Sequence, residues 1–518
     1  MRAFSKNLLL KTFGATPRPL TQRRDFAAPL TILVMTAFAA IVGLGIPILE
    51  FWVPAIVSAL VLSVLVLALP PPIIIWLMLI LVFLVVGQLT FFLGFQQALW
   101  LPYLLLLLIA VKYLMERFRL SNHHRTLLNL STIPILIGLS CSFFFLSAVA
   151  NRTDFASVGV AAKNYIFPWF LTLFMVSAIK RSGDLKGVWN FILWIVFIQV
   201  PFAALQHFYF AKLAGADWDA VVGTFGGGFL RGGGSGTMAI FLVFGIVLAA
   251  SLYRRRLSDW RMLLAVTLAA LATVALAEVK IFFICLPIAL VLLFRRDILS
   301  YPIIATGFCF CGALLLGAVL LIYQQSYSER LRGVDNVEGF IDYVFAAESD
   351  PYFFNRTTKE VSRVGALLMW ERYNQASDYR FYIGHGPAAS RQSQTIGTGV
   401  AARKYPFTLE TSTASTMLWD VGLLGYGLFL TLLLVGGMYG LSLARGMPPQ
   451  EAAALDTIGV MLLLDLPLSM YNRDLIDSST AQILLAFSLG YVLLCRKMSR
   501  GDDWRENLQN NQRPKNLP

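Results

Sequence analysis

The stretch IIIWLMLILVFLVVGQLTFFL, residues 73–93, decides the class of this protein. It has no charged side chain, and its length matches that of a helix that crosses a membrane. Similar stretches recur on both sides of it along a chain of 518 residues, of which 57% are hydrophobic and only 14% charged. Soluble domains carry considerably more charge. The composition therefore predicts an all-α polytopic membrane protein.

Working outward from this stretch, we find about 14 apolar runs that are candidate transmembrane helices. Two of them, 262–277 and 281–294, are short and lie almost against each other. The predicted helices are 28–46, 53–69, 73–93, 98–115, 127–149, 164–179, 188–210, 237–252, 262–277, 281–294, 301–323, 416–440, 453–470 and 476–495.

The distribution of Lys and Arg predicts the orientation, because short loops rich in these residues stay in the cytoplasm. They gather in the N-terminal tail, in alternate loops and near the C-terminus, so both termini are expected to be cytoplasmic. The predicted order is a basic tail (1–26), helices 1–11 (27–323) with an outward glycine-rich loop (211–236), a large outer loop (324–415), helices 12–14 (416–497) and a polar tail (498–518).

The net charge of +13 comes mostly from these predicted cytoplasmic loops. Topology and contact with anionic membrane lipids account for it, so we expect no nucleic-acid partner. The outward loops show no cluster of histidines and carboxylates with metal-ligand spacing, and none of the five cysteines lies in the large outer loop. We therefore predict no metal and no cofactor.

The large outer loop, residues 324–415, is too long for a simple connector and is called the cap loop below. It carries ten Lys or Arg and ten Asp or Glu, a balance that favours a folded, mainly helical cap. Residues 359–376 have a helical pattern, with Val361, Val364 and Leu368 on one side and Arg363 near Trp370 on another. An amphipathic helix over the membrane domain is expected here.

A turn after this helix, Phe381–Pro387, contains His385 between two glycines. A histidine in this position can accept a proton near neutral pH. It is equally well explained as a turn residue whose ring is held by the backbone.

The glycine-rich segment VGTFGGGFLRGGGSG, residues 222–236, leads directly into a predicted transmembrane helix. Glycines allow backbone N–H groups to approach an anion closely, and Arg231 adds a forked donor. The Lys-Ser/Thr pair of a nucleotide-binding loop is missing. An anion site and a flexible hinge both remain open as interpretations.

Lys280 lies at the outer edge of the two short helices, where an ordinary snorkelling lysine would also lie. Arg231, Lys280 and Arg363 thus supply one cation each from three separate outward segments. Convergent positive charge of this kind suits a diphosphate.

Four features occur in this order along the chain: Gly223-Thr224-Phe225-Gly226, Lys280, Arg363 with Gly384-His385-Gly386, and Leu418-Trp419-Asp420-Val421-Gly422-Leu423-Leu424-Gly425. With them the chain resembles the O-antigen ligase and O-antigen polymerase superfamily of bacterial membrane glycosyltransferases. The resemblance spans about residues 190–440. It implies an enzyme of the bacterial inner membrane that transfers glycans from undecaprenyl diphosphate at the periplasmic face, with inversion and without a metal.

Where ligases of this superfamily carry a His-Asn pair, this chain has Leu409-Glu410-Thr411-Ser412. This departure favours a polymerase of O-antigen, capsule or exopolysaccharide repeat units, with a ligase that uses lipid A core or another acceptor as the alternative. A lipid-linked glycan flippase or transporter, with Asp465 as its deep ionisable residue, is the second alternative.

The resemblance also implies roles for individual residues. Arg231, Lys280 and Arg363 are expected to contact the diphosphate, and Arg372 is a further candidate. His385 or Glu410 accepts the proton of the attacking hydroxyl, while Asp420 caps or braces a helix. Substrate contacts are expected from Gly223, Thr224, Trp370 and Tyr382. A chain-length regulator and other polysaccharide assembly proteins are expected partners.

Overall fold

The computed structural model describes residues 63–120, 132–210, 221–226, 234–277, 279–300, 306–307, 317, 354–355, 359–393 and 397–499. About 81% of these residues are helical. The all-α polytopic architecture expected from the composition is therefore confirmed in outline.

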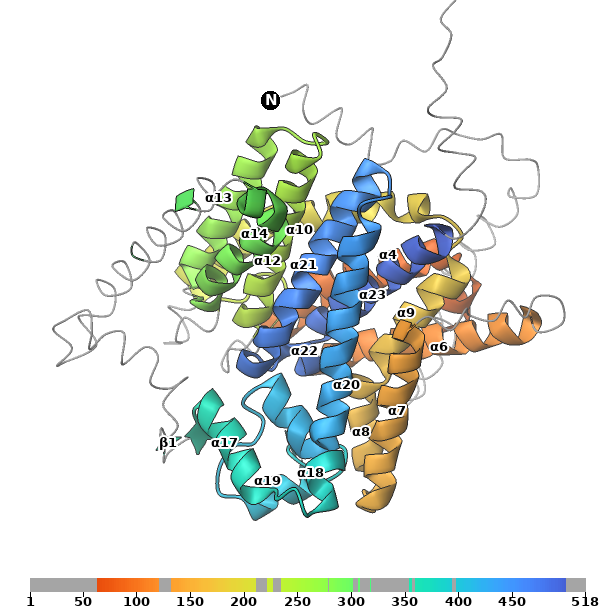
Figure 1. The fold of residues 1–518 in the computed structure, drawn as a ribbon, viewed down its shortest axis with the longest axis vertical. Helices are drawn as coiled ribbons and strands as arrows, with labels where there is room; N and C mark the ends of the chain where they lie inside the picture. The colour runs from red at the N-terminus through yellow and green to blue at the C-terminus, as the bar shows by residue number, and fades with distance from the viewer. Residues whose placement is uncertain are drawn as a thin grey trace, which may run out of the picture.

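The helices pack as a bundle with a smaller group of short elements at one end (Figure 1). In chain order they are α4 (Pro71–Ile80), η1 (Leu81–Val85), α5 (Val86–Phe92), η2 (Gln96–Trp100), α6 (Leu101–Leu120), α7 (Thr132–Ala150), α8 (Phe155–Tyr165), α9 (Phe167–Ala178), η3 (Ser182–Leu185), α10 (Lys186–Leu205), η4 (Gln206–Phe210), α12 (Ser235–Arg254), α13 (Trp260–Ala277), α14 (Ile281–Ser300), α17 (Arg363–Tyr373), α18 (Tyr379–Ile383), α19 (Val400–Lys404), α20 (Thr413–Leu443), α21 (Pro449–Tyr471), α22 (Asp474–Asp477) and α23 (Ser479–Ser499). Two short antiparallel pairs of strands, β1 (Phe354–Asn355) with β2 (Glu360–Val361) and β3 (Gln392–Ser393) with β4 (Gly397–Thr398), belong to the cap loop.

Within the described residues, nine helices are long and apolar enough to cross a membrane. The count becomes ten if α8 and α9, which meet at a bend of 45°, form one span. Each of these ten overlaps a span expected from the sequence. Of the remaining four, 281–294 is the helix α14, whose last turns carry Arg295, Arg296 and Asp297. The spans 28–46, 53–69 and 301–323 lie wholly or mostly outside the described residues.

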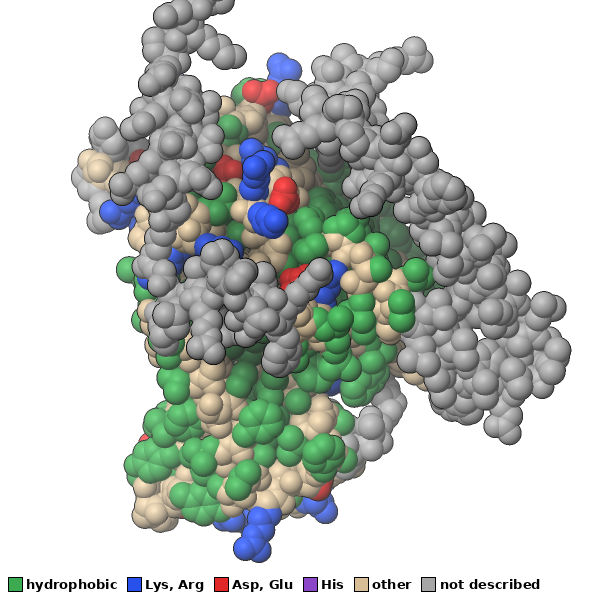
Figure 2. Space-filling model, turned by 90° about the vertical axis from the view of Figure 1, so that its right-hand side faces the viewer, with side chains coloured by type: hydrophobic (Ala, Val, Ile, Leu, Met, Phe, Trp, Pro, Cys, Tyr) green, Lys and Arg blue, Asp and Glu red, His purple; other side chains and the backbone are tan. Residues whose placement is uncertain are grey.

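The flank of the bundle is apolar. Helix α6, for example, exposes Leu104, Leu107, Val111 and Leu114 at helical spacing. Figure 2 shows hydrophobic side chains over much of the lower flank, with Lys and Arg side chains grouped in the upper part and at the lower tip. This distribution is consistent with a flank that faces lipid.

Two polar contacts define one end of the bundle, which we call the cap end. The Thr237 hydroxyl, in the first turn of α12, donates to Asp474 Oδ2 at 2.7 Å just after α21 ends. The backbone N–H of Thr413, the first residue of α20, donates to the carbonyl of Asn472 at 3.0 Å. The start of α12, the end of α21 and the start of α20 therefore lie together. The opposite end, where α12 ends at Arg254, is called the arginine end.

Helix α20 does not run straight. Gly422 in its interior has φ 72° and ψ −173°, outside the helical region. Tyr426 bonds Ser469 near the end of α21 at 2.8 Å, yet Thr413 also reaches Asn472 there. A straight helix would separate Thr413 from Tyr426 by about 20 Å along its axis. The residues before Gly422 therefore form a first arm that doubles back beside the longer second arm.

The second arm packs closely against α21. A Cβ added to Gly440 would lie 3.1 Å from the Cα of Gly459, so small residues allow the two backbones to approach. At the bend itself, a Cβ on Gly425 would lie 2.7 Å from the Cβ of Val421. The Gly-Leu-Leu-Gly turn thus has a structural cause: Gly422 reverses the chain, and Gly425 leaves room for the returning arm.

Candidate active site at the cap end

Two of the sequence motifs meet at the bend of α20. Gly384, with φ 77°, ends α18 and lies against the backbone of Asp420 and Val421. A Cβ on Gly384 would lie 2.4 Å from the Asp420 carbonyl oxygen, and a Cβ on Gly422 would lie 2.4 Å from the Gly384 nitrogen. We call this backbone contact between Gly384 and Gly422 the glycine clasp. It fixes the cap loop to a bundle helix.

The bend at Gly422 leaves carbonyl groups at the end of the first arm of α20 without their usual helical N–H partners. Residues of the cap loop donate to these carbonyls instead. The His385 and Gly386 N–H groups donate to the carbonyls of Trp419 and Asp420 at 2.8 and 3.1 Å. Trp370 Nε1 donates to the carbonyl of Leu418 at 3.0 Å. Three consecutive carbonyls are thus bonded by the cap loop.

Asp420 braces this junction, as one of the sequence interpretations held. Its side chain is fully buried, accepting from the Ser390 N–H at 2.9 Å on Oδ1 and from the Tyr165 hydroxyl at 2.9 Å on Oδ2. The Ser147 hydroxyl donates to the Asp420 carbonyl at 2.9 Å. Asp420 therefore joins α7, α8, α20 and the cap loop, and its carboxylate is engaged in structure.

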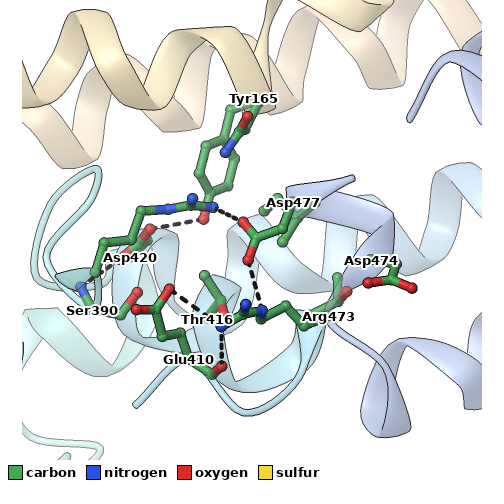
Figure 3. Close-up of polar contacts among 12 residues, drawn as sticks. Tyr165, Ser390, Glu410, Thr416, Asp420, Arg473, Asp474 and Asp477 are labelled. Carbon is green, nitrogen blue, oxygen red and sulfur yellow. Dashed lines mark hydrogen bonds and ion pairs between the residues drawn. The ribbon is translucent and has the colours of Figure 1, made fainter. Parts of the chain in front are cut away.

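A chain of charged side chains runs next to Asp420, and we call it the charge cluster (Figure 3). Arg391 of the cap loop pairs with Asp477 of α22 at 2.5 Å. Asp477 also pairs with Arg473 Nε at 3.0 Å, and Arg473 Nη1 lies 3.8 Å from Glu410 Oε2. Of the two arginines, Arg391 is only 12% exposed and Arg473 is 48% exposed. The inner pair is thus largely shielded from solvent, whereas the Arg473 end of the cluster opens toward it.

Glu410 is the carboxylate at the open end of the cluster. Gln392 N–H donates to its Oε1 at 3.1 Å, and Arg473 Nη1 donates to its main-chain carbonyl at 3.3 Å. Burial, reinforced by the negative charge of Asp477, raises the pKa of Glu410 above its ordinary value, against the opposing effects of the Gln392 N–H and Arg473. A carboxylate held in place with a raised pKa is suited to accept a proton.

Asp474 points away from the charge cluster in Figure 3. It accepts from Thr237 at 2.7 Å and from Asn472 Nδ2 at 2.9 Å. Burial raises its pKa, while these two hydrogen bonds act in the opposite direction. Asp474 thus anchors the start of α12, the helix into which the glycine-rich segment leads.

The His385 imidazole is held by the Asn374 side chain and packs near Trp419. Its Nε2 lies 2.7 Å from Asn374 Oδ1, and its ring centroid lies 5.2 Å from that of Trp419. Burial, followed by the nearby charges of Arg380 and Lys404, lowers the pKa of His385 to about 4. The imidazole is therefore neutral at neutral pH and a weak proton acceptor.

Gly223 and Thr224 lie inside the bundle. Thr224 is fully buried, and its N–H donates to Gln199 Oε1 at 2.8 Å. Gln206 Nε2 donates to the Gly223 carbonyl at 2.8 Å, and Gly223 has φ 61° with Gln199 packed against it. These contacts give the motif a packing role. Arg231, in the same segment, lies outside the described residues.

Arg363 begins α17 and places its guanidinium carbon 3.8 Å from the ring centroid of Tyr471, the last residue of α21. Tyr471 stands two residues before Arg473 of the charge cluster in the chain. Lys280 precedes α14, which starts at the cap end because α12, α13 and α14 are joined by short connections and reverse direction in turn. Arg372 is exposed near the other end of α17, about 13 Å from Arg363 along the axis.

The two aromatic candidates differ in exposure. Trp370 is 6% exposed and stacks on Phe381 with ring centroids 4.8 Å apart, whereas Tyr382 is 41% exposed. Helix α17 packs on α20 with Ala366 and Trp370, while Val364 and Leu368 are exposed. Tyr382 thus offers a ring at the surface, and Trp370 is part of the core.

Sequence reasoning did not single out Arg391, Arg473 or Asp477. A signal existed for the last two, because the short connection 471–480, which the sequence predicts to face outward, holds Arg473, Asp474 and Asp477 between two apolar helices. Several charges this close to the ends of two apolar helices are candidates for pairing with one another. Arg391 had no such signal, since its partner lies 86 positions further along the chain.

Among the described residues, no three His, Cys, Asp or Glu side chains gather as metal ligands would. Comparison with protein-family models and with curated proteins gives no match for this chain.

Proposed function

We propose that this protein is a membrane glycosyltransferase that polymerises oligosaccharide repeat units carried on undecaprenyl diphosphate. The reaction would take place at the periplasmic face of the bacterial inner membrane. The observation that carries the proposal is the position of Glu410: a held carboxylate of raised pKa lies beside Arg473, two residues from the ring on which Arg363 stacks.

In the proposed reaction, an acceptor hydroxyl attacks the anomeric carbon of the donor sugar while Glu410 takes the hydroxyl proton. The glycosidic bond forms as the bond to the diphosphate breaks, and the diphosphate leaves with its electron pair. Because this leaving group is already good, positioning and charge stabilisation are the main requirements. Arg473 and the Gln392 N–H orient the Glu410 carboxylate.

We assign the diphosphate to Arg363 and Lys280 at the cap end. Arg231, which lies outside the described residues, stays a third candidate from the sequence alone. We leave Arg372 out of the proposed set because it lies in the last turn of α17, at the other end of the helix from Arg363. Between the two proton acceptors considered, the low pKa of His385 favours Glu410. Tyr382 remains a candidate for stacking on a sugar.

A ligase, which makes a single transfer to lipid A core or another acceptor, uses the same chemistry and is the alternative. A lipid-linked glycan flippase is the second alternative, and it finds an ionisable group within the bundle in Asp465, a buried residue of α21. The cap loop, clasped to α20 beside the charge cluster, favours a catalytic role over a transport role.

Reconstitution of the full chain with purified undecaprenyl diphosphate oligosaccharide and no added metal distinguishes these functions. A ladder of products identifies a polymerase, and a single transfer to a supplied acceptor identifies a ligase. Flipping without any new glycosidic bond contradicts the proposal. Arg363→Ala is expected to abolish product formation, while Arg372→Ala on the same helix is the matched control and keeps it.

A further inference from the structure

A polar cavity lies at the arginine end, far from the charge cluster. It has a volume of about 450 Å³, and its lining includes Arg254, Arg255, Arg295, Arg296, Arg445 and Asp456. The 20 residues of α12 between the two ends correspond to about 30 Å. The cavity is therefore separate from the candidate active site.

Three different parts of the chain supply these arginines. Arg254 and Arg255 end α12, Arg295 and Arg296 lie in the last turns of α14, and Arg445 follows α20. Helices α12, α14 and α21 pack against one another and α20 packs against α21, which brings these ends together around one space. The cavity is thus built by the tertiary fold.

The positive charge of this cavity is only partly neutralised. Arg254 pairs with Asp297 at 2.9 Å, and Arg255 pairs with Asp456 at 2.5 Å. Within the described part of the chain, Arg296 and Arg445 form no ion pair. The Arg295 Nη1 donates to the Leu292 carbonyl at 2.7 Å.

Arginines at a helix end often serve only to set topology and to contact lipid headgroups singly. These arginines instead face one shared cavity, where their charges repel. Burial and then the neighbouring charge of Arg296 lower the pKa of Arg295. Like charges held this close are destabilising unless an anion lies between them.

We propose that this cavity binds an anion bearing at least two phosphate groups. Guanidinium groups donate in pairs to phosphate oxygens, and Arg295, Arg296 and Arg445 provide such forks from two sides of the cavity. The cavity volume is within the range of about 300–1,000 Å³ that is common for small-molecule sites. The ion pair between Asp456 and Arg255 forms one wall of the cavity, so part of the positive charge there is already neutralised.

Two sources can supply this chemistry: the headgroup of a lipid with two phosphates, or a soluble diphosphate from the aqueous phase. The full chain in phosphatidylcholine nanodiscs distinguishes them. Cardiolipin binding is measured by native mass spectrometry, and inorganic pyrophosphate binding is measured by calorimetric titration.

The test variant is Arg296→Gln combined with Arg445→Gln, since neither residue belongs to an ion pair within the described residues. Arg261→Gln, an exposed arginine in the first turn of α13, is the matched control. We expect the double variant to weaken binding of one probe by about tenfold or more, because charge-assisted hydrogen bonds are lost. The control should bind like the wild type.

Binding of cardiolipin without binding of pyrophosphate assigns the site to a lipid headgroup. Saturable binding of pyrophosphate assigns it to a soluble ligand. If neither probe binds the wild type better than the double variant, the proposal is overturned. Neither measurement involves glycosyl transfer, so the outcome is independent of the function proposed for the cap end.

Discussion

Gly422 lies so close to Gly384 that a Cβ on Gly422 would stand 2.4 Å from the Gly384 amide nitrogen. Both residues have positive φ, 72° and 77°, a conformation that other residues rarely adopt. The contact joins a turn of the cap loop to the bend of α20, and the two partners are 38 positions apart in the chain.

Gly422→Ala is expected to destabilise the fold by about 2–4 kcal/mol, because it adds both backbone strain and a steric clash. Thermal unfolding of the purified protein in detergent measures the loss. Gly427→Ala, on the second arm of α20, is the control, since a Cβ there meets nothing within 4 Å. Equal unfolding temperatures for both variants would contradict the clasp.

Asp420 and Tyr165 are expected to act as one unit. Asp420→Asn and Tyr165→Phe each remove or weaken the 2.9 Å hydrogen bond between them, and each should cost about 1–3 kcal/mol. The double variant should lose clearly less than the sum of the two single losses. A double-mutant cycle of unfolding free energies measures this coupling, and strict additivity would show that the bond contributes nothing.

The folded protein should lose stability as the pH falls, in part because of His385. Its pKa is about 4 in the fold and 6.5 as the ordinary value, so the unfolded chain binds the proton first. The contribution is complete above pH 6.5 and is lost as the pH falls toward 4. At about pH 5 the loss is on the order of 2 kcal/mol.

The variant His385→Gln isolates this effect. Its unfolding temperature should fall less than that of the wild type between about pH 7.5 and about pH 5, since glutamine does not titrate. Parallel pH curves for the two proteins would show that the imidazole has the same pKa folded and unfolded.

Glu410→Gln is expected to lower the rate of glycosyl transfer by about 100-fold or more, because an amide accepts no proton. In the wild type the rate should fall as the pH decreases through the raised pKa of Glu410, since the carboxylate becomes protonated. The reconstituted assay measures both. His385→Gln should keep the same pH dependence, and a lost acid limb in that variant would instead assign the base role to His385.

The membrane helices could be predicted from the sequence because lipid imposes a simple rule on length and charge. Residues 73–93, for instance, correspond to the helices between Pro71 and Phe92. The helix in the cap loop was also predictable, since α17 lies within 359–376. The face of α17 that packs against the bundle was not predictable. Periodicity distinguishes two sides of a helix, but the burial of Ala366 and Trp370 depends on packing against neighbouring elements such as α20.

The candidate site was only partly predictable. Glu410 was a candidate because of its position before a membrane helix, and Arg363 because it is a cation in an outer segment. The partners of the charge cluster depend on long-range folding, since Arg391 and Asp477 come from different elements and meet only after α20 doubles back. The neutral state of His385 likewise depends on its burial against Trp419 and Asn374.

The glycine clasp holds its two segments through main-chain atoms, so its geometry is insensitive to most side-chain changes around it. Side chains on the surface of the cap loop can therefore change, while these two positions are expected to stay glycine. A pair of glycines, one after a short helix and one at the bend of the next long apolar helix, is consequently a search pattern for distant homologues whose overall sequence identity has faded.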